Sequence, residues 1–229
     1  MSAPKSEADL AAVVVAWLEA QNWDVYQEVS HSGPVIDIVA VRGPVVWAIE
    51  CKLALNLTVL AQAEAHRTHL RSVAVPTTKR AFEERRLCVR IAKHYLQVGI
   101  LEVVGDEHAR GVRIVTPAPL LRHNHSEAQR LRAKLRPEHK THAKAGAAGG
   151  GYWTPYKETM RDVRNLLAKA GAHGLSLREI MVGLSKHHWA TERSMRSCLP
   201  TALESYEKDW CRVTGEGRGK RYLLAEASQ

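Results

Sequence analysis

Apolar and polar residues follow regular spacings in the first half of the chain, and each spacing predicts an element. From residue 7 to 20, apolar residues recur at helical intervals after a capping serine, which predicts a helix. Two runs rich in β-branched residues lie within residues 35–53, separated by a Gly-Pro pair. Such runs on either side of a turn predict a β-hairpin, and residues 24–30 predict a strand before it.

The pattern continues as alternating helices and strands up to about residue 118. Helical spacing predicts helices over residues 57–71 and 79–96, and apolar runs predict strands over residues 72–75, 99–104 and 112–115. The resulting order, α-β-β-β-α-β-α-β-β, is typical of an α/β domain whose sheet is covered by helices. Residues 1–118 are therefore predicted to form one domain.

Beyond residue 118 the pattern changes twice. Residues 119–156 combine a short basic helix with a Gly- and Ala-rich stretch of low complexity, which is typical of a flexible linker. Residues 157–229 return to amphipathic spacing, with three predicted helices followed by a hairpin that has a Gly-rich basic tip. The chain is thus predicted to hold two folded domains joined by a basic connector.

Composition restricts the class of protein. Hydrophobic residues make up 45% of the 229-residue chain, which is enough for a buried core. No apolar run approaches the roughly 20 residues that a membrane span needs, and the first residues lack the pattern of a signal peptide. Four cysteines without paired spacing indicate reduced thiols and no zinc cluster. We therefore expect a cytoplasmic protein that makes no membrane contact.

The formal net charge of +9 is unevenly distributed. Residues 1–118 carry 13 basic and 13 acidic side chains, residues 119–157 carry 8 and 2, and residues 158–229 carry 12 and 9. The excess of positive charge lies after the first domain, chiefly in the connector. Such asymmetry favours a polyanionic partner, although a solvated basic linker would show the same charge.

Three charged residues, Asp37, Glu50 and Lys52, stand within the apolar hairpin. With the turn at residues 43–44, Asp37 is expected to face Glu50, with roughly 5 Å between Cβ atoms, where like charges are destabilising. Glu50 and Lys52 share one face of their strand, and Cys51 points to the other. A divalent cation of the Mg²⁺ kind, which takes oxygen ligands, would remove the conflict between the carboxylates.

An aspartate followed after twelve residues by Glu-x-Lys, across a strand-turn-strand, resembles the signature of the PD-(D/E)XK nuclease superfamily, the restriction-endonuclease-like fold. The resemblance covers about residues 6–118 and includes the αβββαβ core order, here with an extra helix and strands. It implies that Asp37, Glu50 and the backbone carbonyl of Cys51 bind Mg²⁺ or Mn²⁺. It also implies that Lys52 positions or activates the attacking water. Ile36 departs from the pattern, because the family name has proline there.

The same resemblance implies two more site residues. Gln62, ten residues after Lys52, resembles a glutamine that many members place beside the substrate. Members often add a glutamate from the first helix. Glu7 has the right place for that role, and Glu19 is the alternative.

Three helices followed by a β-hairpin resemble a winged helix-turn-helix domain, over about residues 157–226. In that family the third helix usually enters the DNA major groove and the wing contacts the backbone. Winged helices also dock on proteins, so recruitment of a protein partner is the alternative. The basic residues expected to contact nucleic acid lie on the connector helix, the third helix and the hairpin: Arg130, Arg132, Lys134, Arg193, Arg196, Arg218, Lys220 and Arg221.

Together these features predict a magnesium-dependent deoxyribonuclease whose second domain docks on DNA, with endonuclease preferred over exonuclease action. The alternative is a non-catalytic DNA-binding or regulatory protein that keeps the nuclease fold as a scaffold. The residues leave open RNA as a substrate and the preferred structure or sequence of the nucleic acid. Cleavage of both strands by one active site per chain would favour a homodimer.

Overall fold

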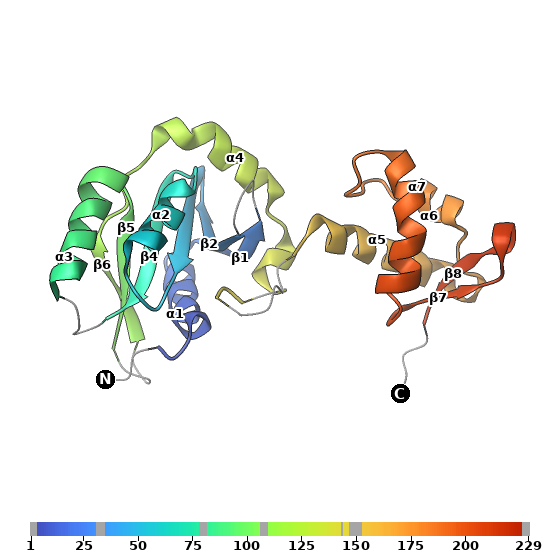
Figure 1. The fold of residues 1–229 in the computed structure, drawn as a ribbon, viewed down its shortest axis with the longest axis horizontal. Helices are drawn as coiled ribbons and strands as arrows, with labels where there is room; N and C mark the ends of the chain where they lie inside the picture. The colour runs from blue at the N-terminus through green and yellow to red at the C-terminus, as the bar shows by residue number, and fades with distance from the viewer. Residues whose placement is uncertain are drawn as a thin grey trace. The chain divides into compact units, whose positions relative to one another are not determined.

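The computed structural model describes residues 4–30, 35–77, 82–105, 110–142, 144–146 and 153–225, without the side chains of residues 82–84, 110 and 218. The chain divides into two compact units, Met1–Trp153 and Thr154–Gln229, and each is treated by itself (Figure 1). The protein is a mixed α/β protein, with a helix-covered sheet in the first unit and a β-hairpin that follows helices in the second. Among the described residues, no helix is long and apolar enough to cross a membrane.

A mixed sheet of six strands, within the described residues, forms the centre of the first unit. The strands lie side by side in chain order: β1 (Asp24–Ser30), β2 (Val35–Arg42), β3 (Val45–Cys51), β4 (Leu70–Pro76), β5 (Gly99–Gly105) and β6 (Arg110–Thr116). Strands β3, β4 and β5 run parallel, whereas every other neighbouring pair is antiparallel. Parallel neighbours need a crossover connection, and helices α2 and α3 supply the two that this sheet requires.

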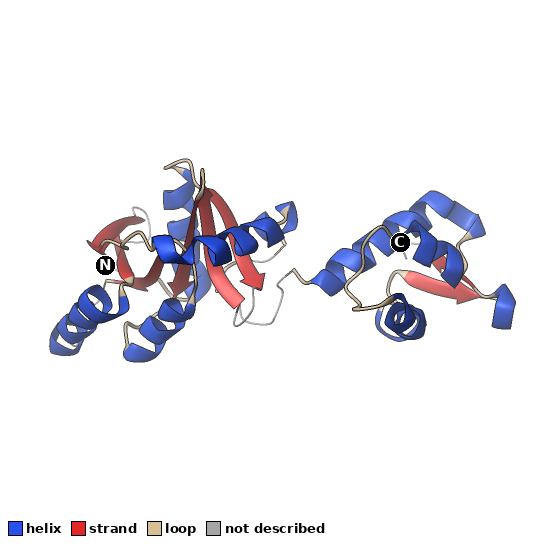
Figure 2. Ribbon diagram, turned by 90° about the horizontal axis from the view of Figure 1, so that it is seen from above, coloured by secondary structure: helices blue, strands red, loops and turns tan. Residues whose placement is uncertain are grey.

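Helices lie on both faces of this sheet (Figure 2). The helical segments of the first unit are α1 (Glu7–Glu19), α2 (Leu57–Ala65), α3 (Phe82–Ile91), η1 (Ala92–Leu96), η2 (Arg122–Asn124), α4 (His125–Lys134) and η3 (Pro137–Lys140). Helix α1 begins as predicted, because the Ser6 side chain accepts a hydrogen bond from the backbone N–H of Asp9. It covers one face of the sheet, and α2, α3 and α4 share the other.

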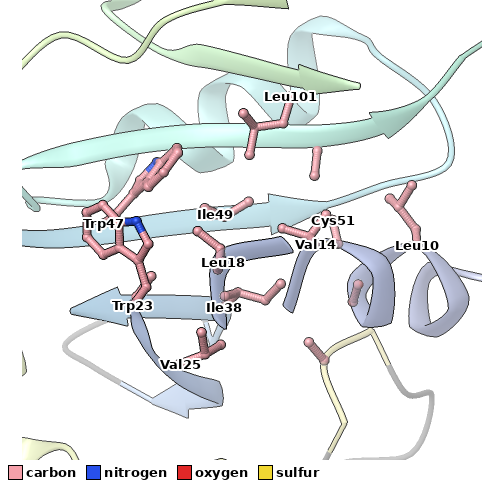
Figure 3. Packing of buried hydrophobic residues seen from close by; sticks show 14 of the residues in the cluster. Leu10, Val14, Leu18, Trp23, Val25, Ile38, Trp47, Ile49, Cys51 and Leu101 are labelled. Carbon is pink, nitrogen blue, oxygen red and sulfur yellow. The ribbon is translucent and has the colours of Figure 1, made fainter. Parts of the chain in front are cut away.

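A cluster of buried hydrophobic residues packs between α1 and the sheet (Figure 3). Leu10, Val14 and Leu18 of α1 are fully buried against alternate residues of β2 and β3, including Ile38 and Ile49. Alternation along a strand sends neighbouring side chains to opposite faces. The same packing therefore directs the residues between these positions toward the face that carries α2 and α4.

Helix α4 packs on that opposite face rather than lying apart as a connector. Ala128 and Leu131 are buried in a cluster with residues of β2 and β3, such as Val39 and Ala48. After α4, Lys140 forms an ion pair with Asp24. Residues predicted as a linker over 119–153 therefore belong to the first compact unit. Most of the Gly- and Ala-rich stretch after residue 142 lies outside the described residues.

The second unit has the predicted sequence of elements. Its segments are α5 (Pro155–Ala170), η4 (Gly171–His173), α6 (Leu177–Gly183), α7 (Glu192–Thr201), η5 (Ala202–Tyr206), β7 (Cys211–Thr214), η6 (Gly217–Gly219) and β8 (Arg221–Leu224). The capping box at Ser176 and Glu179 is confirmed, with both reciprocal hydrogen bonds present. Pro200, expected to kink or split the third helix, lies inside α7, and the helix then widens into the π-helical turn η5.

The structure contradicts one predicted element near the site. The helix predicted over residues 57–71 ends at Ala65, and strand β4 begins at Leu70. His66 has an extended backbone (φ −72°, ψ 122°), so the helical hydrogen-bond series stops there. Leu70 onward is needed in the centre of the sheet, and that pairing outweighs the helical propensity of the segment.

Candidate active site

The predicted register of the hairpin is confirmed up to the position of the charged pair. Arg42 pairs with Val45 across the turn, and the ladder continues to Ile38 opposite Ile49, which makes Asp37 and Glu50 the next positions. The ladder stops there. The side chain of Asp37 crosses to β3 instead, and its Oδ2 accepts a hydrogen bond of 2.7 Å from the backbone N–H of Cys51.

Both carboxylates of this pair are buried. Asp37 is 8% exposed and Glu50 is 5% exposed, although carboxylates are almost never buried without a partner. Burial, and secondly the negative charge of Glu50, raises the pKa of Asp37 to about 7. The hydrogen bond from Cys51 and the charge of Lys52 act in the opposite direction but do not offset the burial. The structure thus holds two mutually repelling acids in a nearly dry position.

Lys52 stands directly after β3, and its ammonium group joins two acids. Its Nζ lies 2.8 Å from Oε2 of Glu7 and 3.8 Å from Oδ2 of Asp37. Burial tends to lower the pKa of Lys52, but the hydrogen bond to Glu7 and the charge of Asp37 outweigh it and raise that pKa. Glu7 begins α1, so the start of the first helix reaches the predicted site. Glu19, the alternative, ends the same helix and is exposed.

Sequence reasoning missed His66 as a site residue. Helical spacing through residues 57–71 would place His66 and His69 on one polar face of a helix, yet both histidines are buried at 6% and 5% exposure. The Nε2 atom of His66 lies 2.5 Å from Oε1 of Glu50. His69 turns elsewhere, because its Nδ1 accepts from the backbone N–H of Val46 and its Nε2 lies 3.0 Å from Nδ1 of His125. The helical pattern did not place His66 beside Glu50, because its position depends on where α2 ends.

Glu28 on β1 is the second residue that sequence reasoning missed. The β1–β2 ladder pairs Gln27 with Ile38 and Val29 with Ile36, which places Glu28 opposite Asp37 although this pair is absent from the ladder. Its φ of 51° is rare for a residue with a side chain. Burial raises the pKa of Glu28 against a lowering hydrogen bond from Gly146, and the charge of Glu50 raises it further.

Residues 144–146, called here the 144–146 segment, contact residues beside this cluster. The backbone N–H of Ala145 donates to Oε1 of Gln27, and that of Gly146 donates to Oε1 of Glu28. Gly146 also lies so close to the start of α1 that an added Cβ would stand 2.7 Å from the carbonyl carbon of Glu7. The segment that follows α4 in the chain therefore lies against both Glu28 and Glu7.

Gln62 is not brought into the cluster. It lies on the exposed face of α2, and the hydrogen bonds of the described residues include none between Gln62 and the acidic cluster. The thiol of Cys51 faces the core under α1 and is fully buried (Figure 3), and burial raises its pKa well above the usual value. The backbone of Cys51, rather than its thiol, is what the site can use. Cys51, Cys198 and Cys211 are free cysteines.

The donor set suits a hard cation that keeps most of its water. Within the described ranges, no three His, Cys, Asp or Glu side chains are grouped so as to hold a metal ion by themselves. Mg²⁺ does not require such a group, because it usually retains several waters and takes one or two carboxylates from the protein. Asp37, Glu50 and the carbonyl of Cys51 meet that requirement. Burial first, and the charge of Glu50 second, raise the pKa of Asp37, and a bound cation would act against both. These residues fit Mg²⁺ or Mn²⁺.

The basic residues of α4 have mixed surroundings. Arg130, Arg132 and Lys134 are all exposed on the side of α4 that faces away from the core. Arg130 is paired with Glu127, an exposed pair worth little in stability. All three remain accessible to a polyanion.

The basic residues of the second unit fall into two groups. Arg193 and Arg196 are exposed on α7. Lys220 is engaged by Glu204 at 2.8 Å, and Arg221 donates to the carbonyl of His173 at 2.8 Å. The side chain of Arg218 lies outside the described residues.

The chain was compared with protein-family models, curated proteins and solved structures, and none of the three comparisons finds a match. Residue chemistry and geometry are therefore the basis for inferring a function. The site contains the buried carboxylates of Asp37 and Glu50. The ammonium group of Lys52 lies 3.8 Å from Asp37, and a ring nitrogen of His66 contacts Glu50.

Proposed function

We propose that the protein is a metal-dependent nuclease that hydrolyses phosphodiester bonds in DNA. The observation that carries this proposal is the convergence of Asp37, Glu50 and Lys52 at one end of the β2–β3 hairpin, with both carboxylates buried. A scaffold has no structural need for two adjacent buried acids, because each uncompensated buried charge is destabilising. A bound cation would compensate the negative charge of both carboxylates.

Phosphodiester hydrolysis needs an activated water and stabilisation of negative charge on the phosphorus centre. A bound Mg²⁺ or Mn²⁺ would supply both, by lowering the pKa of a water and by neutralising phosphate oxygens. The strands position its ligands rigidly, since Asp37 is fixed by the N–H of Cys51 and Glu50 by the ring of His66. The Cys51 carbonyl lies on the same strand as Glu50.

Lys52 is suited to act on the attacking water or the phosphate. Its side chain is 30% exposed, and its ammonium group lies within 4 Å of Asp37, so it can contact a group bound at the carboxylates. Its ion pair with Glu7 holds the side chain at the site without burying the charge completely. Glu7 is therefore assigned to orient Lys52, in addition to its predicted role as a ligand.

The order of elements supports a restriction-endonuclease-like core. Its αβββαβ order corresponds to α1 through β4, with a meander of three antiparallel strands followed by a parallel crossover. For the second unit, three helices and a hairpin support a winged helix, and an isolated bridge pairs Leu175 with Tyr222 of β8. Arg193 and Arg196 on α7 are then the residues that would face the DNA.

One observation indicates that the β7–β8 hairpin, the wing, makes fewer contacts with DNA than predicted. Lys220 and Arg221 are held by intramolecular partners, so fewer of the predicted wing contacts are accessible to phosphate. Recruitment of a protein partner by the second unit is therefore the second candidate for that unit. It leaves the proposed chemistry of the first unit unchanged.

The test incubates the intact protein with linear, nicked, branched and single-stranded DNA, and with RNA, in Mg²⁺ or Mn²⁺. We expect cleavage of DNA that EDTA abolishes, and a loss of about 100-fold or more in Asp37→Ala and Lys52→Ala. Lys93→Ala, which removes an exposed lysine of the same unit, is the matched control and should cleave normally. DNA binding should weaken steeply as salt rises.

Two results would contradict the proposal. Cleavage that survives in Asp37→Ala or Lys52→Ala would remove the site. Absence of cleavage on every substrate, together with salt-sensitive DNA binding, would favour a non-catalytic DNA-binding protein built on the same fold.

A further inference from the structure

We propose that His66 is a positioning residue that fixes the carboxylate of Glu50 so that its second oxygen remains available to the cation. This inference rests on the proposed function, since it concerns the same site. The two residues come from different elements: Glu50 from β3, and His66 from the first position after α2.

The contact between His66 and Glu50 is short and buried. Nε2 of His66 lies 2.5 Å from Oε1 of Glu50, and the two side chains are each 6% exposed. The oxygens of an ionised carboxylate only accept hydrogen bonds, so the proposed role uses the His66 tautomer that carries its proton on Nε2. His66 is itself held by the chain, because its backbone N–H donates to the carbonyl of Ala63 and ends α2.

A fixed donor matters because the last torsion of glutamate is soft. Rotation about that bond is broad and roughly two-fold, so an unrestrained carboxylate presents either oxygen in many directions. Hydrogen bonding through Oε1 selects one orientation. Partners that orient metal-binding carboxylates in this way typically change metal affinity by about 10- to 100-fold when they are removed.

The carboxylate of Asp37 is also held through one of its two oxygens. Oδ2 of Asp37 accepts the backbone N–H of Cys51. Among the described residues, no hydrogen bond reaches Oδ1 of Asp37 or Oε2 of Glu50. Each acid thus has one oxygen committed to the protein and one left over. This division suits a cation that takes a single oxygen from each of two carboxylates.

His69 provides the contrast that isolates this role. It is as buried as His66 and only three residues away, but its ring nitrogens contact Val46 and His125 rather than an acid. Replacing His69 removes a buried imidazole from the same α2–β4 loop but removes no contact with Glu50. His69→Ala is therefore the matched control for a purely structural loss.

The experiment measures Mn²⁺ affinity by isothermal titration calorimetry without nucleic acid, in the wild type and in His66→Ala, His66→Gln, His66→Asn and His69→Ala. We expect His66→Ala to weaken Mn²⁺ binding by about 10- to 100-fold. The amide nitrogen of Gln reaches roughly where Nε2 stands, so His66→Gln should recover affinity to within a few-fold. The shorter Asn should behave like Ala. His69→Ala should bind Mn²⁺ as the wild type does.

Cleavage assays at increasing Mn²⁺ then separate positioning from chemistry. The rate of His66→Ala should approach the wild-type rate when the cation is raised by the same factor as the lost affinity. Urea denaturation of each variant reports whether the first unit is folded at the assay temperature. His66→Gln, which keeps a donor, is the variant that tests the role if His66→Ala does not fold.

Different failures point to different errors. Wild-type Mn²⁺ affinity in His66→Ala, or an equal loss in His69→Ala, would overturn the positioning role while leaving the nuclease proposal intact. Cation binding that follows the expected series in a protein that cleaves no substrate would support the positioning role and remove the proposed activity. A wild-type protein that binds no Mn²⁺ would overturn both.

Discussion

Replacing Gly146 by alanine tests whether the 144–146 segment shapes the candidate site. Gly146 has a φ of +72°, in the left-handed region. An alanine Cβ there would stand 2.7 Å from the carbonyl carbon and 2.8 Å from the Cβ of Glu7, and 2.9 Å from the backbone nitrogen of Ala8. These are atoms of the helix start, so no flexible side chain can move aside.

The expected magnitude follows from two contributions. The left-handed backbone with a Cβ costs roughly 1–2 kcal/mol, and overpacking against a fixed neighbour costs about 1–3 kcal/mol. Gly146→Ala should therefore lower the free energy of unfolding by about 2–5 kcal/mol. If the segment moves away instead, it gives up the hydrogen bond of its N–H to Glu28.

Gly43→Ala is the matched control. Gly43 has a φ of +54° in the β2–β3 turn, and an added Cβ would meet no atom within 4 Å. It carries the conformational cost of roughly 1–2 kcal/mol alone. Urea denaturation followed by circular dichroism compares the stabilities of the two variants. Metal-dependent cleavage compares the sites, and only Gly146→Ala should lose activity under folding conditions.

Equal stability and equal cleavage in the two variants would refute this reasoning. It would mean that the segment yields without moving Glu7 or Glu28. The close approach of Gly146 would then have no bearing on the site.

Three further changes test other parts of the structure. Leu131→Ala should cost about 2–5 kcal/mol in urea denaturation because Leu131 is 1% exposed under α4, whereas Arg132→Ala, on the exposed side, should cost almost nothing. Ser176→Ala removes the cap of α6 and should cost about 1 kcal/mol, and a thermal shift near zero would contradict the capping role. Hydrogen bonds from Lys220 and Tyr222 lower the pKa of Glu204, so their stabilisation is present above the usual glutamate pKa and is lost as the pH falls through the folded value. In Lys220→Met, urea denaturation between about pH 3 and 6 should show a weaker loss of stability on acidification than in the wild type.

The register of the hairpin could be predicted because it depends on local information. A two-residue turn and the period of two along each strand determine which residues stand opposite. The convergence of Asp37, Glu50 and Lys52 follows from that count. Glu7 came from the family resemblance, with Glu19 as the alternative, and the structure places Glu7 beside Lys52.

The position of His66 could not be predicted, because it depends on a competition between two elements. Residues 57–71 have helical spacing throughout, and the strand β4 takes the last of them only because the sheet offers parallel neighbours on both sides. Tertiary pairing of this kind outweighs local propensity. Glu28 was missed for a related reason, since its place opposite Asp37 depends on the register of β1 against β2 rather than on a local pattern.

The docking of α4 was also not predicted from composition. Its basic residues and the low-complexity stretch after it are typical of a linker, and only Ala128 and Leu131 mark the buried side. Two small apolar contacts in a charged segment give a weak amphipathic signal. The fold supplies the matching surface on β2 and β3, which the segment alone does not reveal.

The docking of α4 has a consequence for dissecting the protein. A fragment cut after residue 118 would lose Ala128 and Leu131 and expose the apolar sheet face that they cover, which invites aggregation. The same cut would remove the N–H of Gly146 from Glu28. A fragment ending at Trp153 keeps both. Limited proteolysis should therefore release a stable N-terminal piece that extends well past the last strand of its sheet.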